Sequence, residues 1–238
     1  MPELYRSPSF YERLFSQRAH DVEFYRWLAE GQEELLELGA GTGRVSLPLL
    51  KDGLRVVALE RAPEMLEVLE RRAEGLGVRE RLTALNADFR HFEAPRRFRL
   101  AVCPFNGFAH LHTAGELRGT LESVERHLEP RGVLVCDVLQ LEEHHEANTT
   151  HLTPYFEHPD SGVPCRVLET LKFDAETRRL RSELRVTAMR GPEYVAEHTL
   201  DLRFWTLDEL ANEGRAAGLG LRNTASLGDS LALVFCKL

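Results

Sequence analysis

The sequence predicts an α/β protein built around a parallel sheet, and three observations lead to that class. Apolar runs of strand length alternate with amphipathic segments through the first 140 residues, which is the pattern of right-handed strand–helix–strand crossovers. The first such run ends in a turn with glycine at alternate positions, residues 39–43. After residue 165, three segments alternate apolar and polar residues singly, as antiparallel strands with one solvated face do.

The composition narrows the class of protein. The chain has 238 residues, 43% of them hydrophobic, which suffices for one sizeable domain with an embellishment. It contains no run of eighteen apolar residues and no apolar leader at the N-terminus, so we expect neither a membrane span nor secretion. The four cysteines form no Cys-x-x-Cys pair, which favours a reduced, cytoplasmic protein. A net charge of −8 argues against a nucleic-acid partner and favours a small molecule.

The expected elements follow from periodicity and from helix-start signals. Helices are expected over residues 7–30, 45–51, 63–73, 113–128 and 206–218, with Thr-x-x-Glu capping boxes at Thr113 and Thr206. Crossover strands are expected over residues 34–38, 54–59, 81–87, 98–103 and 133–139. The antiparallel meander is expected over 166–173, 180–189 and 194–204, and a terminal strand pair over 219–225 and 231–237. Residues 141–164 lack a period and read as a long loop with room for one helical turn.

The spacing of the glycines selects the cofactor class. A dinucleotide-binding turn requires Gly-x-Gly-x-x-Gly, but residue 44, where the third glycine would fall, is Arg44. The chain instead reads Glu37-x-Gly39-x-Gly41-x-Gly43. This run resembles the first motif of the class I S-adenosylmethionine-dependent methyltransferases, (Asp/Glu)-x-Gly-x-Gly-x-Gly.

Two later segments also resemble that family. Glu60 ends the second strand and opens Glu-Arg-Ala-Pro-Glu-Met, similar to the family's second motif, in which the acid accepts hydrogen bonds from both ribose hydroxyls. Ala87-Asp88-Phe89 is similar to the adenine element, with Asp88 facing the amino group and the backbone of Phe89 a ring nitrogen. The alternative for Glu60 is a solvated acid before a helix. The alternative for Asp88 is a turn in which its carboxylate bonds to its own backbone. The resemblance implies this cofactor-binding set: Tyr11, Glu37, Gly39, Ala40, Gly41, Gly43, Glu60, Arg61, Met65, Asp88, Phe89, Pro104, Phe105 and Asn106.

The segment Pro104-Phe105-Asn106-Gly107-Phe108-Ala109-His110-Leu111 follows the fourth strand, at the active-site end of such a sheet. It resembles Pro-Phe-x-x-x-x-His-Leu of a bacterial subgroup. Phe105 and Phe108 would wall the cationic sulfonium, and His110 would be the catalytic base, unless it only packs within the loop. Phe108, His110 and Trp205 form the expected substrate set.

The resemblance implies a Rossmann-like seven-stranded methyltransferase sheet with N-terminal lid helices and an inserted antiparallel β-meander. Residues 1–140 and 206–238 would form the S-adenosylmethionine-binding domain, and 141–205 an insert that acts as substrate lid or homodimer contact. Tyr11 on a lid helix would reach the methionine part, or simply pack as part of an amphipathic helix.

A metal site is not expected. Histidines 144, 145, 151 and 158 cluster with glutamates 142, 143 and 146, but no spacing matches a known metal box, so a solvated loop is favoured. Asn106 lacks the aspartate partners of the metal-dependent relatives.

The sequence thus predicts metal-independent methyl transfer from S-adenosylmethionine to a small-molecule acceptor, with S-adenosylhomocysteine as product. The acceptor atom (N, O, C or S) cannot be predicted, because substrate residues of this fold lie on variable loops. Two alternatives stay open: a non-catalytic protein that binds the same cofactor, and an NAD(P)-dependent oxidoreductase, which the glycine spacing disfavours.

Overall fold

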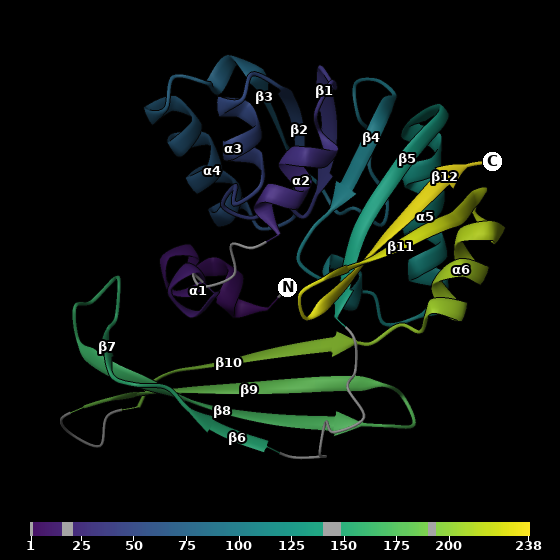
Figure 1. Ribbon diagram of the computed structural model, residues 1–238. Coiled ribbons are helices and arrows are strands. Elements are labelled where there is room, and N and C mark those ends of the chain that lie inside the picture. Colours follow the sequence, from purple (N-terminus) through teal and green to yellow (C-terminus); the bar gives the residue numbers. More distant parts are fainter. Residues whose placement is uncertain (1, 16–20, 140–148, 190–193) are drawn as a thin grey trace. The chain divides into compact units, whose positions relative to one another are not determined.

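The computed structural model describes residues 2–15, 21–139, 149–189 and 194–238, and this part of the chain forms two compact units (Figure 1). The large unit comprises residues 18–140 and 205–238, and the small unit comprises 1–17 and 141–204. The first 17 residues therefore group with the antiparallel insert, whereas the sequence analysis assigned them to the cofactor-binding domain. Trp205 belongs to the large unit instead of the insert.

The large unit is organised around one sheet. Its strand order is β11-β12-β5-β4-β1-β2-β3, with β1 to β5 parallel and β12 antiparallel to both β5 and β11. This confirms the predicted methyltransferase-type sheet. The strands are β1 (Glu34–Leu38), β2 (Arg55–Glu60), β3 (Leu82–Asn86), β4 (Phe98–Cys103), β5 (Leu128–Leu139), β11 (Leu219–Leu227) and β12 (Ser230–Lys237).

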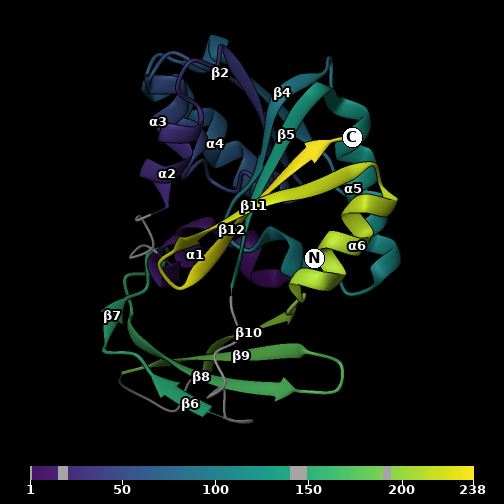
Figure 2. The same ribbon diagram turned by 45° about the vertical axis from the view of Figure 1, so that its right-hand side comes forward.

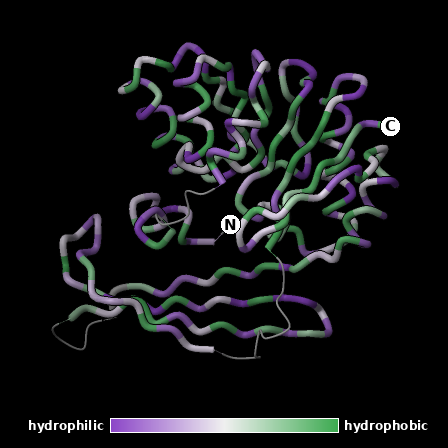
Figure 3. The backbone as a smooth tube through the Cα atoms, viewed as in Figure 1, coloured by the Kyte–Doolittle hydropathy of each residue, from purple (hydrophilic) through white to green (hydrophobic). Residues whose placement is uncertain are grey.

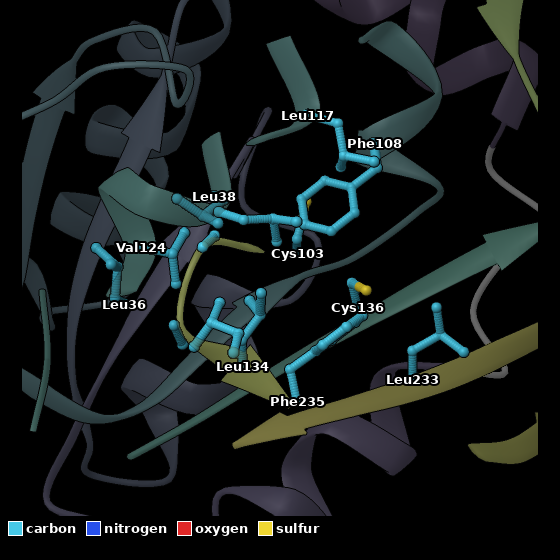
Figure 4. Close-up of a cluster of buried hydrophobic side chains, with 14 of the residues drawn as sticks. Leu36, Leu38, Cys103, Phe108, Leu117, Val124, Leu134, Cys136, Leu233 and Phe235 are labelled. Atoms are coloured by element: carbon cyan, nitrogen blue, oxygen red, sulfur yellow. The ribbon is translucent and has the colours of Figure 1, made fainter. Parts of the chain in front are cut away.

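Alternation along the strands sends side chains to two separate cores, one on each face of the sheet. On β1, Leu35 joins the core that contains residues of α2, α3 and α4, and Leu36 joins the core under α5 and α6. Figure 2 shows the two helix groups on opposite sides, and Figure 4 shows the second core around Phe108 and Phe235. The helices are α2 (Val22–Leu28), α3 (Ser46–Lys51), α4 (Pro63–Gly75), α5 (Ala114–His127) and α6 (Leu207–Ala216), with 3-10 turns η2 (Arg79–Arg81) and η3 (Gly107–His110).

Helix starts follow the capping chemistry that the sequence predicts. Thr113 Oγ1 accepts from Glu116 N at 3.1 Å, and the Glu116 carboxylate accepts from Thr113 N, which forms a complete capping box. Thr206 and Glu209 form the same arrangement before α6. No helix in the described ranges combines the length and the hydropathy that crossing a bilayer requires.

The small unit contains an antiparallel sheet of order β10-β9-β8-β6, with β7 paired to β8. The predicted meander is confirmed as β8 (Pro164–Asp174), β9 (Arg179–Ala188) and β10 (Tyr194–Arg203). The prediction of a loop over 141–164 is wrong in part, because β6 (Thr149–Leu152) and β7 (Phe156–Glu157) pair with β8 there. Short, polar edge strands lack the alternation on which a sequence-based prediction depends.

The two faces of this small sheet differ. One face, here called the inner face, carries buried apolar residues that form a core with η1 (Glu3–Arg6) and α1 (Pro8–Phe15), including Leu4 and Phe10. The opposite, outer face carries ion pairs such as Lys172–Glu183. In Figure 3 hydrophobic colour runs along the central strands of the large unit, whereas colours alternate along β8 to β10.

Gly214 and Gly119 both lie inside helices, but only Gly214 is tightly packed, so replacing them separates the effect of packing from that of helix propensity. A Cβ on Gly214 of α6 would lie 2.8 Å from Phe235 Cε1 and 3.0 Å from the Leu219 carbonyl oxygen, whereas on Gly119 of α5 it would lie 3.9 Å from the nearest atom. We expect Gly214→Ala to lower the free energy of unfolding by about 1–3 kcal/mol through overpacking. Gly119→Ala should raise it by roughly 0.5–1 kcal/mol through helix propensity. Urea denaturation measures both, and equal effects would contradict this account of α6 packing.

Candidate active site

The glycines of the turn after β1 have two roles: one allows close packing, and another leaves space for a ligand. All three glycines have positive φ, at +71° for Gly39, +56° for Gly41 and +94° for Gly43, which side chains with a Cβ rarely adopt. A Cβ on Gly43 would lie 2.8 Å from Leu47 Cγ, so this glycine lets α3 begin directly after the turn. Around Gly41 no described atom lies within 4 Å of a Cβ position. The side of the turn at Gly41 is therefore the one open to a ligand.

Glu60, the last residue of β2, holds this turn in place. Its Oε2 accepts from Gly41 N at 2.9 Å and its Oε1 accepts from Ala62 N at 2.7 Å. Burial raises the pKa of the Glu60 carboxyl, and these backbone hydrogen bonds oppose the rise. A carboxylate offers about four lone-pair positions. With the backbone amides of Gly41, Ala62 and Arg61 as donors, the Glu60 carboxylate still keeps acceptor capacity beside the open side of Gly41.

Glu37 lies below the turn, at the penultimate position of β1, with 2% of its surface exposed. Ser46 Oγ donates to its Oε2. Burial raises the pKa of Glu37 to about 7, while the Ser46 hydrogen bond and the charge of Arg44 act against the increase. The carboxyl supports the start of α3 and is positioned to influence charge at the turn without reaching solvent.

A buried ion pair joins the turn to the residue before α2. Asp21 has no exposed surface, and its carboxylate accepts from both terminal nitrogens of Arg44, with Nη2–Oδ2 at 2.9 Å. The Arg44 guanidinium carbon also lies 5.2 Å from the centroid of the Phe105 ring. Arg44, which breaks the dinucleotide pattern, thus links the glycine turn to the loop after β4.

The loop after β4 is held by Asp137 of β5, a residue that the sequence analysis missed. Phe105 and Asn106 both have left-handed φ values, +61° and +55°, an uncommon conformation for residues other than glycine. Their backbone amides donate to Asp137 Oδ1 at 2.7 Å and Oδ2 at 3.0 Å, and Tyr25 Oη donates to Oδ1 at 2.6 Å. Burial raises the pKa of Asp137, and these three donors oppose it. A lone acid inside the apolar run 133–139 was the signal available in the sequence.

Two expected substrate residues are core residues in this structure. Phe108 has no exposed surface and lies in the core beneath α5, as Figure 4 shows. Trp205 is 6% exposed, and its Nε1 donates to the Phe108 carbonyl oxygen at 3.0 Å. Neither side chain offers surface to a substrate here, so we revise both to structural roles. Phe108 is buried as part of the 3-10 turn η3, and Trp205 lies in the same core.

His110 lies half-buried at the end of η3. Burial, helped by the nearby charges of Arg61 and His112, lowers the pKa of His110 to about 4. The imidazole is therefore neutral near pH 7, and the lowered pKa also makes it a weaker base than an exposed histidine. The geometry keeps the catalytic hypothesis for His110 open as a prediction.

Two arginines, Arg90 and Arg61, fill the hydrogen-bond acceptor positions of the Asp88 carboxylate. Its Oδ1 accepts from Arg90 N and Nε, each at 3.0 Å, and its Oδ2 accepts from Arg90 Nη2 at 2.6 Å and Arg61 Nη1 at 3.2 Å. Burial disfavours the charged form, but these hydrogen bonds outweigh it and hold the pKa of Asp88 well below its usual range. Because four donors fill its acceptor positions, Asp88 can accept from a ligand only where a donor leaves. Arg61 makes the longest of these bonds.

The remaining expected residues lie either beside the glycine turn or in buried positions. Phe89 Cε1 lies 3.8 Å from the position of a Cβ on Gly39, which brings the adenine element beside the glycine turn. Met65 is 1% exposed within α4, Ala40 is 5% exposed, and Pro104 is buried at the end of β4. The side chains of these three residues are therefore buried.

Tyr11 belongs to the small unit, where its ring lies 5.5 Å from that of Tyr5 and 4.9 Å from that of Phe15. Of the histidine- and glutamate-rich segment, residues 142–146 lie outside the described residues. In the described ranges no three or more histidine, cysteine or acidic side chains group as metal ligands would.

Comparison with known proteins bears on this arrangement. A family model described as "Methyltransferase domain" matches residues 35–132, a stretch that holds the glycine turn, Glu60, Asp88 and the loop after β4. This stretch, less than half of the chain, is similar to that domain family. The resemblance to class I methyltransferases predicted from the glycine spacing is confirmed over this stretch.

Curated relatives are similar to about half of this chain or less. A "putative methyltransferase" of Bacillus subtilis is 27% identical over 55% of this chain and 53% of its own length. A glycine/sarcosine/dimethylglycine N-methyltransferase of Actinopolyspora halophila is 32% identical over 46% of this chain and 20% of its own. A Streptomyces fradiae aminosugar N,N-dimethyltransferase is 33% identical over 43% and 38%. The matches thus span about half or less of these relatives' length.

Solved structures extend the likeness of the fold to most of the chain. The CcbJ methyltransferase of Streptomyces caelestis superposes with a TM-score of 0.76 at 22% identity, covering 91% of this chain and 88% of that one. CalS10 of Micromonospora echinaspora, an amino pentose methyltransferase solved with S-adenosylmethionine bound, gives a TM-score of 0.74 at 22% identity, with 96% of both chains covered. The methyltransferase fold with its antiparallel insert is therefore shared with these proteins.

Asp137 provides a test of how the β4 loop is held. In Asp137→Asn an amide NH2 must face a backbone N–H of Phe105 or Asn106, so we expect the free energy of unfolding to fall by about 2–4 kcal/mol. Tyr25→Phe, which removes one donor and keeps the carboxylate, should cost only about 1 kcal/mol. Urea denaturation and amide hydrogen exchange at residues 105 and 106 measure the effects. Unchanged exchange in Asp137→Asn would refute the role of Asp137.

Proposed function

We propose that the protein transfers a methyl group from S-adenosylmethionine to a small-molecule acceptor. The observation that carries the proposal is the pairing of an open glycine turn with the carboxylate of Glu60, whose free acceptor positions lie beside Gly41. A vicinal diol such as a ribose edge offers hydroxyl donors that suit a carboxylate acceptor at the end of the second strand. The methyltransferase-domain match over the same residues supports this choice of cofactor.

The other candidate residues would contact different parts of the same cofactor. The turn from Gly39 to Gly43 would carry the methionine part, with Glu37 acting on its ammonium through the backbone or water. Phe89 beside Gly39 would meet the adenine, and Asp88 would accept from the adenine amino group where Arg61 swings away. Pro104, Phe105 and Asn106 would face the sulfonium from the β4 loop, with the Phe105 ring available to a cation.

Methyl transfer asks mostly for alignment and for exclusion of water. When bound, S-adenosylmethionine would supply a methyl carbon activated by the sulfonium, with S-adenosylhomocysteine as the neutral thioether leaving group. Rigid backbone at Gly39–Gly43 and at Phe105–Asn106 would fix the line of attack. His110, neutral at pH 7, would take the proton that leaves the acceptor. This chemistry requires no metal, and we propose none.

The acceptor is proposed to be a small amine. Relatives named as N-methyltransferases of glycine and of an aminosugar share the domain, and a sugar N-methyltransferase from Streptoalloteichus shares the fold with a TM-score of 0.74. The net charge of −8 also favours a cationic acceptor over a polyanion such as nucleic acid. A homodimer formed through the antiparallel insert is part of the proposal and is testable by sedimentation.

Calorimetric titration tests the cofactor assignment. We expect micromolar binding of S-adenosylmethionine and S-adenosylhomocysteine and no binding of NAD or NADP. Turnover of amines from the aminosugar and amino-acid classes then distinguishes an enzyme from a protein that only binds the cofactor. Dinucleotide binding, or binding of none of these compounds, would overturn the proposal.

Glu60 gives the sharpest variant of the cofactor site. Glu60→Ala should weaken binding of S-adenosylmethionine by about 1.5–3 kcal/mol, since the ribose hydroxyls lose a charged acceptor. Glu60→Gln keeps an acceptor for Gly41 N and should lose less. Calorimetry measures both, with Glu80→Ala on the exposed turn η2 as control. Wild-type affinity in Glu60→Ala would remove the ribose assignment.

His110 separates catalysis from binding. His110→Ala should leave cofactor affinity within about twofold and lower kcat roughly 10²- to 10⁴-fold, the range for loss of a general base. Because the pKa of His110 is lowered to about 4, protonation of this group should reduce the wild-type kcat only as pH falls toward 4, and not between pH 6 and 8. His112→Ala is the matched control. An unchanged kcat in His110→Ala would make His110 a structural residue.

A further inference from the structure

Arg90, in the turn after β3, is fixed to helix α5 at two points. Its carbonyl oxygen accepts from Ser123 Oγ at 3.0 Å, and its Nη1 donates to Glu116 Oε1 at 2.7 Å. Glu116 and Ser123 lie on one face of α5, because positions i and i+7 of a helix share a face. The backbone and the side chain of Arg90 are therefore both held independently of its contacts with Asp88.

Glu116 serves the start of α5 and Arg90 at the same time. Its Oε2 accepts from the backbone amides of His112 at 2.8 Å and Thr113 at 3.1 Å. Its Oε1 accepts from Arg90. Because the capping box fixes the glutamate side chain, the Arg90 guanidinium bonds to a carboxylate that does not turn freely. The start of α5 thus orients the guanidinium.

A second edge of the same guanidinium holds Asp88. Arg90 Nε donates to Asp88 Oδ1 at 3.0 Å, and Nη2 donates to Oδ2 at 2.6 Å. Such a two-point contact brings the carboxylate into the plane of the guanidinium. Arg61 Nη1 completes the set with a longer bond of 3.2 Å to Oδ2. Asp88 therefore has a fixed plane and one weakly held acceptor position, the one that Arg61 occupies.

The ion pair between Arg118 and Glu213 shows what a purely structural link of α5 looks like. Arg118 Nε lies 2.7 Å from Glu213 Oε2, which joins α5 to α6. Arg90 differs because its second acidic partner, Asp88, follows a strand of the candidate site. The neighbour of Asp88, Phe89, lies beside the glycine turn. All these residues belong to the large unit.

We propose that Arg90 is a positioning residue that makes the site selective for a purine with an amino group at C6. It acts through Asp88, whose carboxylate it holds in one plane with one acceptor position to yield. This inference rests on the proposed function, which brings the adenine of the cofactor to Asp88. It deepens that function by naming the residue that sets the choice of purine.

The selectivity follows from the difference between a fixed and a free acceptor. An amino group at C6 replaces the bond from Arg61 with a new N–H donor. An oxo group there brings its lone pairs toward a carboxylate that Arg90 prevents from turning away, which is repulsive. A free carboxylate would be ordered at a cost when it binds the amino group, and it would turn away from the oxo group. Both changes reduce the selectivity.

The test compares two ligands by calorimetry at pH 7.5. They are S-adenosylhomocysteine and S-inosylhomocysteine, in which an oxo group replaces the amino group at C6. We expect the wild-type chain to bind the adenine compound about 10²-fold more tightly. Arg90→Lys keeps the charge but loses the two-point contact, so it should reduce this ratio of affinities by roughly fivefold or more. The ring nitrogens contribute alike in every variant, so a change in the ratio reports on the group at C6.

Arg118→Lys is the matched control, because it makes the same replacement at an arginine that bonds to a glutamate of the same unit. Its ratio should stay within about twofold of wild type. A variant that only weakens the fold lowers both affinities alike, so equal losses for the two ligands in Arg90→Lys would overturn the proposal. If Arg90→Lys fails to fold, Glu116→Gln decides instead, since glutamine still suits the capping box. Its ratio should fall by about two- to fivefold, and a wild-type ratio would overturn the proposal.

A double-mutant cycle tests whether Arg90 acts through Asp88. Asp88→Asn puts an amide in place of the carboxylate and should lower the ratio by roughly tenfold or more. Adding Arg90→Lys to Asp88→Asn should change the ratio by less than about twofold, because the acceptor that Arg90 orients is gone. Independent effects of the two substitutions would overturn the proposal.

The same titrations distinguish a failure of this inference from a failure of the proposed function. If S-adenosylhomocysteine does not bind to the wild-type chain, the cofactor assignment is overturned and the role of Arg90 with it. If it binds and Arg90→Lys keeps the wild-type ratio, the cofactor assignment stands and only the role of Arg90 is overturned.

Discussion

The carboxylate of Asp137 is the interaction on which the candidate site depends, because it ties three distant segments together at one buried point. It receives Tyr25 from α2 and the amides of Phe105 and Asn106 from the loop after β4. Two successive left-handed residues that are not glycine cost strain, and charge-assisted hydrogen bonds in a dry environment offset it. A neutral side chain at this position would leave donors without a partner. The conformation of the loop after β4 is thus fixed before any ligand binds.

Acids at the carboxyl ends of the strands serve different purposes despite their similar positions. Glu37 is buried, and burial raises its pKa to about 7. A nearby positive charge such as that of Arg44 favours its ionised form. Glu60 is half-buried and holds the backbone of the turn while keeping acceptor capacity. Asp88 is fully engaged by Arg90 and Arg61. Their differing environments, rather than their identity as acids, decide which one is available to a ligand.

Much of the fold could be predicted because local signals and the global pattern agree. Strand alternation fixed both cores, and the Thr113 and Thr206 boxes marked helix starts. Long-range polar contacts could not be predicted in this way, because the sequence around Asp137 does not indicate that its partners lie at residues 105 and 106. Phe108 lies in the loop after β4 and Trp205 follows the meander, which predicts both beside the acceptor; in the structure Phe108 of the 3-10 turn η3 is buried, and Trp205 bonds to its carbonyl oxygen. The strands β6 and β7 escaped prediction because edge strands are short and polar.

The interleaved course of the chain has a consequence for biosynthesis. Each unit is assembled from two stretches separated in the sequence, so neither can be completed from one continuous segment. On the ribosome, β5 emerges about 90 residues before β12, its neighbour in the sheet (residues 139 and 230). Until then β5 offers an open apolar edge from Val133 to Leu139, the kind of edge that pairs with other chains. Slow translation of the insert would prolong that exposure and with it the time in which another chain could pair with β5.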